Sequence, residues 1–135
     1  MKIDKKDFEA MKAKYDTEVK KGKAAKGKKS GNKTNQTDWI FIDRETLEGL
    51  LAKADKDPKV GGIQFYFTEY TEETAEKTHP KEGSAYCGQL TLVMRAANLK
   101  GEKLVSVVKK RGVEDEYQNG GHQCPYHCEP YPTDN

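Results

Sequence analysis

The sequence predicts an α+β fold, a three- to four-stranded antiparallel sheet with one packed helix, preceded by an N-terminal amphipathic helix on a basic linker. Three observations predict it. Runs of aromatic and β-branched residues recur after residue 38, one capped helical pattern lies between the first two runs, and glycine-rich turns separate the later ones. At 135 residues without an internal repeat, the chain has the length of one domain.

Residues 1–19 predict a short amphipathic helix. Phe8, Met11, Tyr15 and Val19 recur at spacings of three, four and four, and Ile3 precedes them. Lysines and acidic residues fill the other faces. Such a helix needs a surface to lie on. The surface is either its own domain or a sister subunit, or else a separate partner or a membrane surface.

Residues 20–37 predict a flexible linker rich in lysine and glycine. Lys20–Lys33 contains seven lysines, three glycines and no acidic residue. The first 37 residues carry 12 Lys and 5 Asp or Glu, whereas the remainder is net acidic. Nucleic acid is therefore a candidate partner for Lys20–Lys33, although this arm has neither arginine nor interleaved aromatic residues. The alternative is a solvated linker.

Residues 38–112 predict the α+β body. Trp39–Ile42 is expected to be a buried strand, and Asp43 then caps a helix that extends to Ala54. Asp57-Pro58 ends that helix, because proline disfavours a helical conformation in the preceding residue. After the turn at Gly61-Gly62, we expect a strand over Ile63–Tyr70, with Ile63, Phe65 and Phe67 on one face.

The second half of the body predicts a β-hairpin. Residues 71–84 are expected to form a long polar loop in which His79 is an exposed histidine. Strands over Cys87–Met94 and Lys103–Val108 follow, with a turn over Asn98–Gly101 between them. In the first of these strands, Leu90, Leu92 and Met94 alternate towards the core. The sheet and its single helix make the α+β arrangement.

Residues 113–135 form a tail rich in Gly, Pro, Cys and His without strand or helix periodicity. Thiolates and imidazoles are the ligands that zinc prefers, and four of them in a tetrahedron make a structural site. Zinc is therefore a candidate cofactor that would hold the tail onto the sheet. The candidate ligands are Cys87, His122, Cys124, His127 and Cys128.

The spacing of these ligands departs from that of standard zinc sites. There is one cysteine pair, and three residues rather than two separate its members. Two alternatives stay open: a disulfide, either Cys124–Cys128 or from Cys87 to one of them, and plain thiols packed as small apolar groups. No catalytic residue is assigned, because adjacent cysteine and histidine side chains in a tail do not make a dyad.

The body and tail together resemble a group of small α+β proteins from Bacteroidota-type bacteria. The resemblance covers residues 38–128. It rests on Trp39, Ile42-Asp43, Leu47, Leu50-Leu51, Val60–Phe67, Gly88–Met94 and the Gly plus Cys-Pro tail. That group has no assigned activity, so the resemblance implies a fold and transfers no site residue.

The sequence favours a non-enzymatic cytoplasmic interaction or assembly protein, with a protein partner or a homo-oligomer formed through residues 1–19. Residues 1–16 contain acidic residues and no apolar run, unlike a secretory signal. No apolar run is long enough to span a membrane. Phosphate-loop, dinucleotide and hydrolase motifs are also missing from the sequence. A metal- or thiol-dependent protein that uses the tail, and a nucleic-acid-associated protein that uses the lysine arm, are the alternatives.

Overall fold

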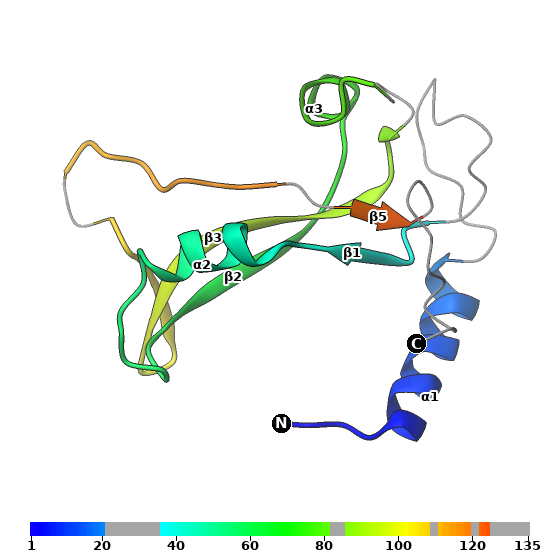
Figure 1. Ribbon diagram of the computed structural model, residues 1–135, viewed down its shortest axis with the longest axis horizontal. Helices are drawn as coiled ribbons and strands as arrows, with labels where there is room; N and C mark the ends of the chain where they lie inside the picture. The colour runs from blue at the N-terminus through cyan, green and yellow to red at the C-terminus, as the bar shows by residue number, and fades with distance from the viewer. Residues whose placement is uncertain (21–35, 82–85, 109–110, 120–121, 125–135) are drawn as a thin grey trace. The chain divides into compact units, whose positions relative to one another are not determined.

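The computed structural model describes residues 1–20, 36–81, 86–108 and 111–119, and the backbone of 122–124 (Figure 1). It confirms the α+β fold and the N-terminal helix. The described elements are α1 (Lys5–Tyr15), η1 (Asp16–Lys20), β1 (Trp39–Phe41), α2 (Arg44–Leu51), β2 (Gly61–Glu69), α3 (Glu72–Thr78), β3 (Leu90–Lys100), β4 (Lys103–Ser106) and β5 (His122–Cys124).

The chain divides into two compact units, each built from separate stretches of sequence. One contains residues 1–40, 69–90 and 123–135, and is called the N-terminal unit here. The other contains residues 41–68 and 91–122, and is called the sheet unit. β1 and β5 form a two-stranded sheet, and β2, β3 and β4 form a three-stranded one.

The three-stranded sheet is antiparallel in the order β2-β3-β4. In the pairing of β3 with β4, Ala97 lies opposite Ser106 and Lys100 opposite Lys103. The two residues between these strands form the hairpin turn, in which Gly101 adopts a φ of 63° that favours glycine. The predicted hairpin is therefore present. However, β3 extends through the predicted turn to Lys100, because the turn itself needs only two residues.

Helix α2 begins as the sequence predicts and lies over one end of the sheet (Figure 1). The Asp43 carboxylate accepts a hydrogen bond from the Thr46 amide at 2.8 Å, which satisfies one amide of the first turn. On its inward side, Leu50 is completely buried. Beyond its last turn, the Asp55 amide donates to Asn98 Oδ1 in β3 at 2.8 Å. These contacts place α2 over the end of the sheet where β2 begins.

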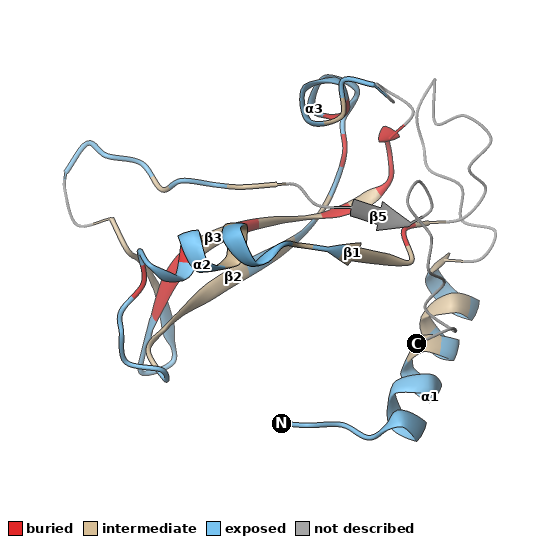
Figure 2. Ribbon diagram, viewed as in Figure 1, coloured by how far each residue is buried: buried red, intermediate tan, exposed pale blue. Residues whose placement is uncertain are grey.

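Towards its other end, β2 carries exposed residues on the same face (Figure 2). Phe65 is 44% exposed and Phe67 is 90% exposed. An eight-residue helix is only about 12 Å long, whereas Phe67 lies about 20 Å along the strand from Gly61. α2 is therefore too short to cover the whole face that Ile63, Phe65 and Phe67 share.

The prediction of a polar loop over residues 71–84 is wrong, because helix α3 forms within this segment. Thr71 and Thr74 form a reciprocal capping box, in which each side chain accepts from the other residue's amide. Ala75, on the inward side of this short helix, is completely buried. The Thr-x-x-Thr pattern at residues 71–74 indicates a helix start. The acidic residues that surround it are also typical of a polar loop, which is why the helix was not expected.

The tail after Gly112 has no strand periodicity in its sequence, yet part of it pairs with strands. Gln118 and Met94 exchange backbone hydrogen bonds of 2.8 and 2.9 Å, so Gln118 lies beside β3. The Asn119 side-chain amide donates to the Leu92 backbone carbonyl at 2.7 Å. β5 pairs with β1, which is shorter than predicted and ends at the exposed Phe41.

Candidate functional site: an apolar groove beside the first helix

The candidate site lies in the N-terminal unit, where α1 and η1 are held against the residues that precede and begin β1. Asp4 caps α1 by accepting from the Asp7 amide at 2.8 Å. The helix buries none of its residues completely. It is therefore fixed by particular polar contacts rather than by a packed apolar face.

A four-charge network makes the first of these contacts. Lys12 Nζ lies 2.6 Å from Asp38 Oδ1 and 3.1 Å from Asp16 Oδ1. Lys20 Nζ lies 3.1 and 3.0 Å from the same two oxygens. All four side chains are at least two-thirds buried, so water screens these pairs less than it screens ordinary surface ion pairs. Their charges cancel within the network.

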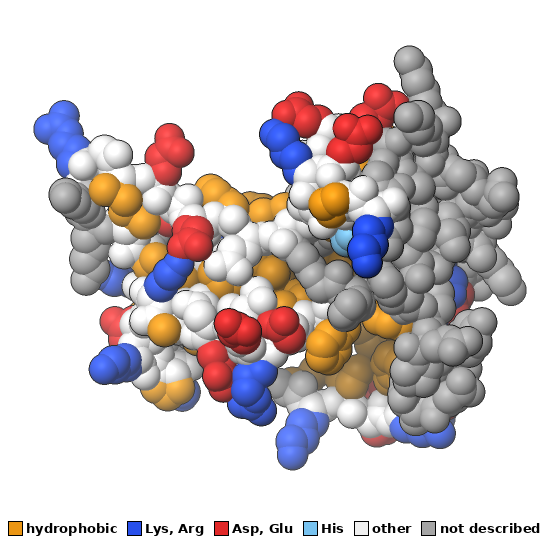
Figure 3. Space-filling model, turned by 45° about the horizontal axis from the view of Figure 1, so that its top comes forward, with side chains coloured by type: hydrophobic (Ala, Val, Ile, Leu, Met, Phe, Trp, Pro, Cys, Tyr) orange, Lys and Arg blue, Asp and Glu red, His pale blue; other side chains and the backbone are white. Residues whose placement is uncertain are grey.

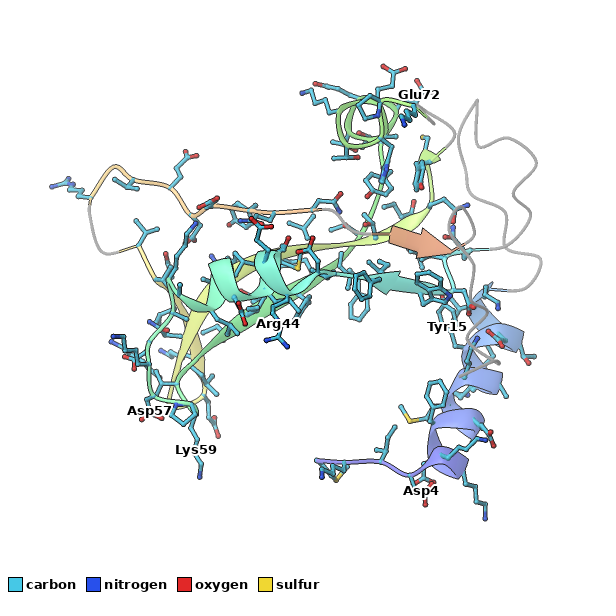
Figure 4. All side chains as sticks on the ribbon, in the orientation of Figure 1. Asp4, Tyr15, Arg44, Asp57, Lys59 and Glu72 are labelled. Atoms are coloured by element: carbon cyan, nitrogen blue, oxygen red, sulfur yellow. The ribbon has the colours of Figure 1, made fainter. Side chains whose placement is uncertain are left out.

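Backbone contacts continue the attachment. The Tyr15 hydroxyl donates to the Thr37 carbonyl at 2.5 Å, from the last turn of α1 (Figure 4). The Thr37 hydroxyl donates to the Leu90 carbonyl at 2.6 Å, and the Gln36 side-chain amide donates to the Gly88 carbonyl at 2.9 Å. α1 is thus connected through residues 36–38 to residues 88–90, within the same unit.

The attachment also brings together the two residues that flank most of the predicted linker. The Gln36 amide donates to the Lys20 carbonyl at 3.1 Å, so the two ends of the predicted linker meet. Residues 21–35, which include most of the lysine arm, lie outside the described residues. Nucleic-acid binding through Lys20–Lys33 stays a prediction.

A groove with a volume of about 300 Å³ lies between α1 and β1. Its apolar lining comes from Phe8, Met11, Tyr15 and Trp39, and the network residues Lys12 and Asp38 border it. Phe8 is 47% exposed and Met11 is 62% exposed. The space-filling view shows hydrophobic side chains at the surface, among charged and uncharged ones (Figure 3). The predicted stripe of α1 therefore lines a groove.

Trp39, which lines this groove, also has an unsatisfied polar atom. Its indole Nε1 is buried and finds no acceptor among the described residues. A buried donor without an acceptor costs about 1–3 kcal/mol. Trp39 is also the sole tryptophan of the chain, so its fluorescence reports directly on this site.

The network changes the pKa of two of its members. Burial alone disfavours the Asp16 carboxylate, but hydrogen bonds from Lys20 and Lys12 outweigh burial and lower the pKa of Asp16. Burial likewise disfavours the Lys12 ammonium, yet Asp38 and Asp16 outweigh it and raise the pKa of Lys12. Burial, Asp38 and Asp16 together raise the pKa of Tyr15. The charged network is therefore the favoured state at neutral pH.

These directions predict how the attachment of α1 depends on pH. The stabilisation from Asp16 is present above its unfolded pKa of about 3.9 and is lost as the pH falls through its lower folded pKa. The stabilisation from Lys12 is present below about 10.4 and is lost as the pH rises through its higher folded pKa. We expect Trp39 emission to stay constant between these limits and to shift to the red below about pH 4.

The matched variant for this measurement is Asp16→Asn, which keeps the side-chain shape and removes the charge. We expect its Trp39 emission to be shifted to the red already at neutral pH and to change less on acidification. Lys14→Gln, at a position that forms an ion pair with the exposed Glu18, should behave like the wild type. A wild-type shift centred near neutral pH would contradict the assignment to Asp16.

The five predicted metal ligands are only partly within the described structure. Cys87 is a buried thiol in the turn before β3. His122 and Cys124 belong to β5, but their side chains lie outside the described residues, as do His127 and Cys128 entirely. Among described side chains, no group of three or more His, Cys, Asp or Glu is arranged to hold a metal. The zinc site therefore stays a prediction.

Native mass spectrometry of the full chain tests the zinc prediction. A site with Cys87, Cys124 and Cys128 as ligands predicts one zinc ion per chain, and chelation should lower the melting temperature because metal binding contributes folding free energy. Cys124→Ser should abolish the metal adduct. A metal-free mass after expression with added zinc would contradict the prediction.

The surroundings of Cys87 favour its neutral thiol. Burial, followed by the negative charges of Glu72 and Glu69, raises the pKa of this thiol. In a variant with Cys124→Ser and Cys128→Ser, we expect alkylation of Cys87 at pH 8 to be at least about tenfold slower in the native protein than in denaturant. Equal rates would contradict both the burial and the raised pKa.

Two polar clusters were missed by the sequence analysis. In the N-terminal unit, His79 stacks on Tyr86 with ring centroids 3.7 Å apart, and its Nε2 lies 3.0 Å from the Tyr70 hydroxyl. The expectation of an exposed His79 is therefore wrong, because α3 carries this residue back onto the aromatic pair. Tyr70 and Tyr86 are both buried, so this cluster is part of the core.

The second missed cluster lies in the sheet unit and centres on Arg95. Its guanidinium donates to Asp115 Oδ2 at 2.6 Å and to Gln64 Oε1 at 2.8 Å, and lies 5.9 Å from the Tyr66 ring centroid. Ser106 donates to the other Asp115 oxygen at 2.5 Å. Every charged group of the cluster has a partner, which is typical of a structural network. The acidic run over residues 114–116 gave no sign of it.

No protein-family model, no curated protein and no solved structure matches the chain. The resemblance to the Bacteroidota-type group therefore stays a prediction. None of the described helices is long and apolar enough to cross a membrane. The geometry of the groove is thus the main basis for a functional proposal.

Proposed function

We propose that the protein is a non-enzymatic cytoplasmic interaction protein that binds an apolar segment of another protein in the groove between α1 and β1. The observation that carries the proposal is the exposure of Phe8 and Met11 on a helix whose position is fixed by the Lys12–Asp38 network. A large apolar side chain exposed singly is ordinary, whereas several that line one groove are typical of an interaction site.

The fixed position of α1 supports binding by a preformed surface. The ion pairs to Asp38 and the Tyr15–Thr37 hydrogen bond orient the helix before any partner arrives. A preformed site loses less conformational entropy on binding than a mobile helix would.

The chemistry of the lining favours apolar side chains as the ligand. Lys12 and Asp38 border the groove, but each already faces an opposite charge, so the groove presents no net charge to a ligand. A volume of about 300 Å³ is at the lower limit for a small-molecule site. Side chains of a partner segment fit this volume.

The described polar clusters also support a binding role over catalysis. Cys87 is buried with a raised pKa, which is the opposite of an activated thiol nucleophile. The Arg95 cluster is an internally satisfied network. These are properties of structural residues.

Site-specific photo-crosslinking in the native cell tests the proposal. A photoreactive phenylalanine analogue at Phe8 should give a discrete adduct with another protein, which Met11→Lys should abolish. The matched control places the same analogue at Leu104, an exposed apolar residue of β4 in the sheet unit. The control position should not give that adduct.

The purified partner then provides the decisive measurement. Its addition should change Trp39 fluorescence in the wild type, and Met11→Lys should weaken the affinity at least about tenfold, because a central apolar anchor commonly contributes more than 1.4 kcal/mol. The proposal fails if positions 8 and 104 give the same adducts, or if Met11→Lys binds the partner as tightly as the wild type. An adduct of Phe8 with a second copy of this chain would also overturn it.

A further inference from the structure

The first strand of the three-stranded sheet has an open edge. Among the described strands, β2 pairs with β3 on one side and with none on the other. β2 is nine residues long, and its residues 61–68 carry no charge and no proline. Proteins commonly protect such edges with lysine, proline, bulges or short strands. The other edge, β4, is protected in this way because it has four residues and begins with a lysine.

The exposed side chains of β2 lie on one face. Alternate residues of a strand share one face, so Ile63, Phe65 and Phe67 lie on the same face of β2. Helix α2 covers this face only where β2 begins. Phe65 is 44% exposed and Phe67 is 90% exposed. An apolar face continuous with an unpaired backbone edge is the combination that β-strand addition uses.

We propose that two copies of this chain pair through β2, antiparallel and around a two-fold axis at Phe65, to form one continuous six-stranded sheet. This surface is separate from the groove beside α1. It provides a homodimer contact that the proposed partner binding does not require.

The backbone geometry allows this pairing. The Val60 carbonyl accepts from the Leu99 amide of β3, and Thr68, eight residues later, bonds the opposite residue Thr91 through its side chain. Backbone groups of alternate residues point to opposite edges of a strand, so those of residues 61, 63, 65, 67 and 69 point to the open edge. A two-fold axis at Phe65 pairs odd-numbered residues with odd-numbered residues, as the hydrogen bonds require.

The side chains and charges of β2 are complementary to those of a second copy. Around this axis Phe65 lies opposite its counterpart, and Ile63 lies opposite Phe67 on both sides of the axis. Aromatic pairs and aromatic–β-branched pairs are favourable across strands. Glu69 lies opposite Gly61, so it is diagonal to Lys59, which lies just before the start of β2 (Figure 4). An opposite-charge pair therefore closes each end, and no like charges meet.

Sedimentation velocity of the full chain over micromolar to submillimolar concentrations tests the proposal. We expect a concentration-dependent dimer, which Phe67→Lys should weaken at least about tenfold because it removes two cross-strand pairs and places two cations in an apolar strip. Phe67 is almost fully exposed, so the variant should keep the wild-type melting temperature. Phe67→Thr, which keeps β-propensity and adds no charge, should weaken the dimer less.

Cysteine crosslinking tests the register. In a background with Cys124→Ser and Cys128→Ser, Phe65→Cys places two thiols at the axis on Cα atoms about 5.5 Å apart, within disulfide range. Phe67→Cys is the matched control, because its two copies lie four residues, or about 14 Å, apart along the strands. Oxidation should give a covalent dimer with Phe65→Cys and not with Phe67→Cys.

Three results would overturn the proposal. The first is a monomer at every concentration. The second is a dimer that Phe67→Lys leaves unchanged but Met11→Lys dissociates, which would place the contact at the α1 groove. The third is equal crosslinking from positions 65 and 67. Loss of the dimer in Phe67→Lys with unchanged partner binding at the groove would support this proposal independently of the proposed function.

Discussion

Gly61→Ala is expected to destabilise the protein by at least about 3 kcal/mol, a large effect for the addition of one methyl group. A Cβ at Gly61 would lie 1.8 Å from the Asp55 carbonyl oxygen and 2.9 Å from the Asp55 nitrogen. The obstacle is backbone, so no side chain can rotate away. Moving Asp55 would also break its 2.8 Å hydrogen bond to Asn98, which connects the end of α2 to β3.

The neighbouring glycine provides the control for this prediction. A Cβ at Gly62 meets no atom within 4 Å. Gly62→Ala should therefore change the free energy of unfolding by less than about 1 kcal/mol, and it can stabilise the protein by restricting the unfolded chain. Urea denaturation of the two variants measures the difference. Equal stabilities would show that Asp55 is not held close to β2.

Asp115→Ala is expected to destabilise the protein by about 3 kcal/mol, because it leaves the largely buried Arg95 guanidinium without its counter-ion. Ser106 loses its acceptor in the same variant, and among the described side chains Gln64 remains to accept from Arg95. The cost comes from an uncompensated charge rather than from the intrinsic strength of the ion pair.

A second substitution distinguishes these two causes. Adding Arg95→Met to Asp115→Ala removes the stranded charge and keeps an apolar stem against Tyr66. The double variant should therefore be more stable than Asp115→Ala alone, although it has one fewer native side chain. Thermal unfolding and urea denaturation measure both variants. A double variant less stable than Asp115→Ala would show that Arg95 stabilises the sheet through packing or Gln64 instead.

The local signals in the sequence predicted much of the fold. Asp43 capped its helix as expected, the Gly101 turn joined the hairpin, and the stripe of Phe8, Met11 and Tyr15 formed a helix. These features depend on residues within a few positions of one another. The same locality explains the miss at α3, whose buried face consists of a single alanine and gives almost no periodicity.

The candidate site depended on contacts that no local pattern contains. Asp38 is 26 residues from Lys12, and Thr37 is 22 residues from Tyr15. The apolar stripe indicated that α1 needed a surface to pack on. The residue that fixes the helix to that surface, Asp38, is distant from α1 in the sequence. Likewise, Asp115 follows Arg95 by 20 residues, so no local pattern in the acidic run over residues 114–116 indicated this ion pair.

The hydrogen bond between the Gln36 amide and the Lys20 carbonyl has a consequence for engineering the chain. Since residues 21–35 leave and re-enter the described structure at adjacent points, changing their number does not alter the distance that they span. Doubling the length of a flexible loop raises the free-energy cost of closing it by only about 0.6 kcal/mol. A fluorescent protein or an affinity tag inserted between Lys20 and Gln36 should therefore leave α1 in place, which makes this the natural insertion point for labelling the protein.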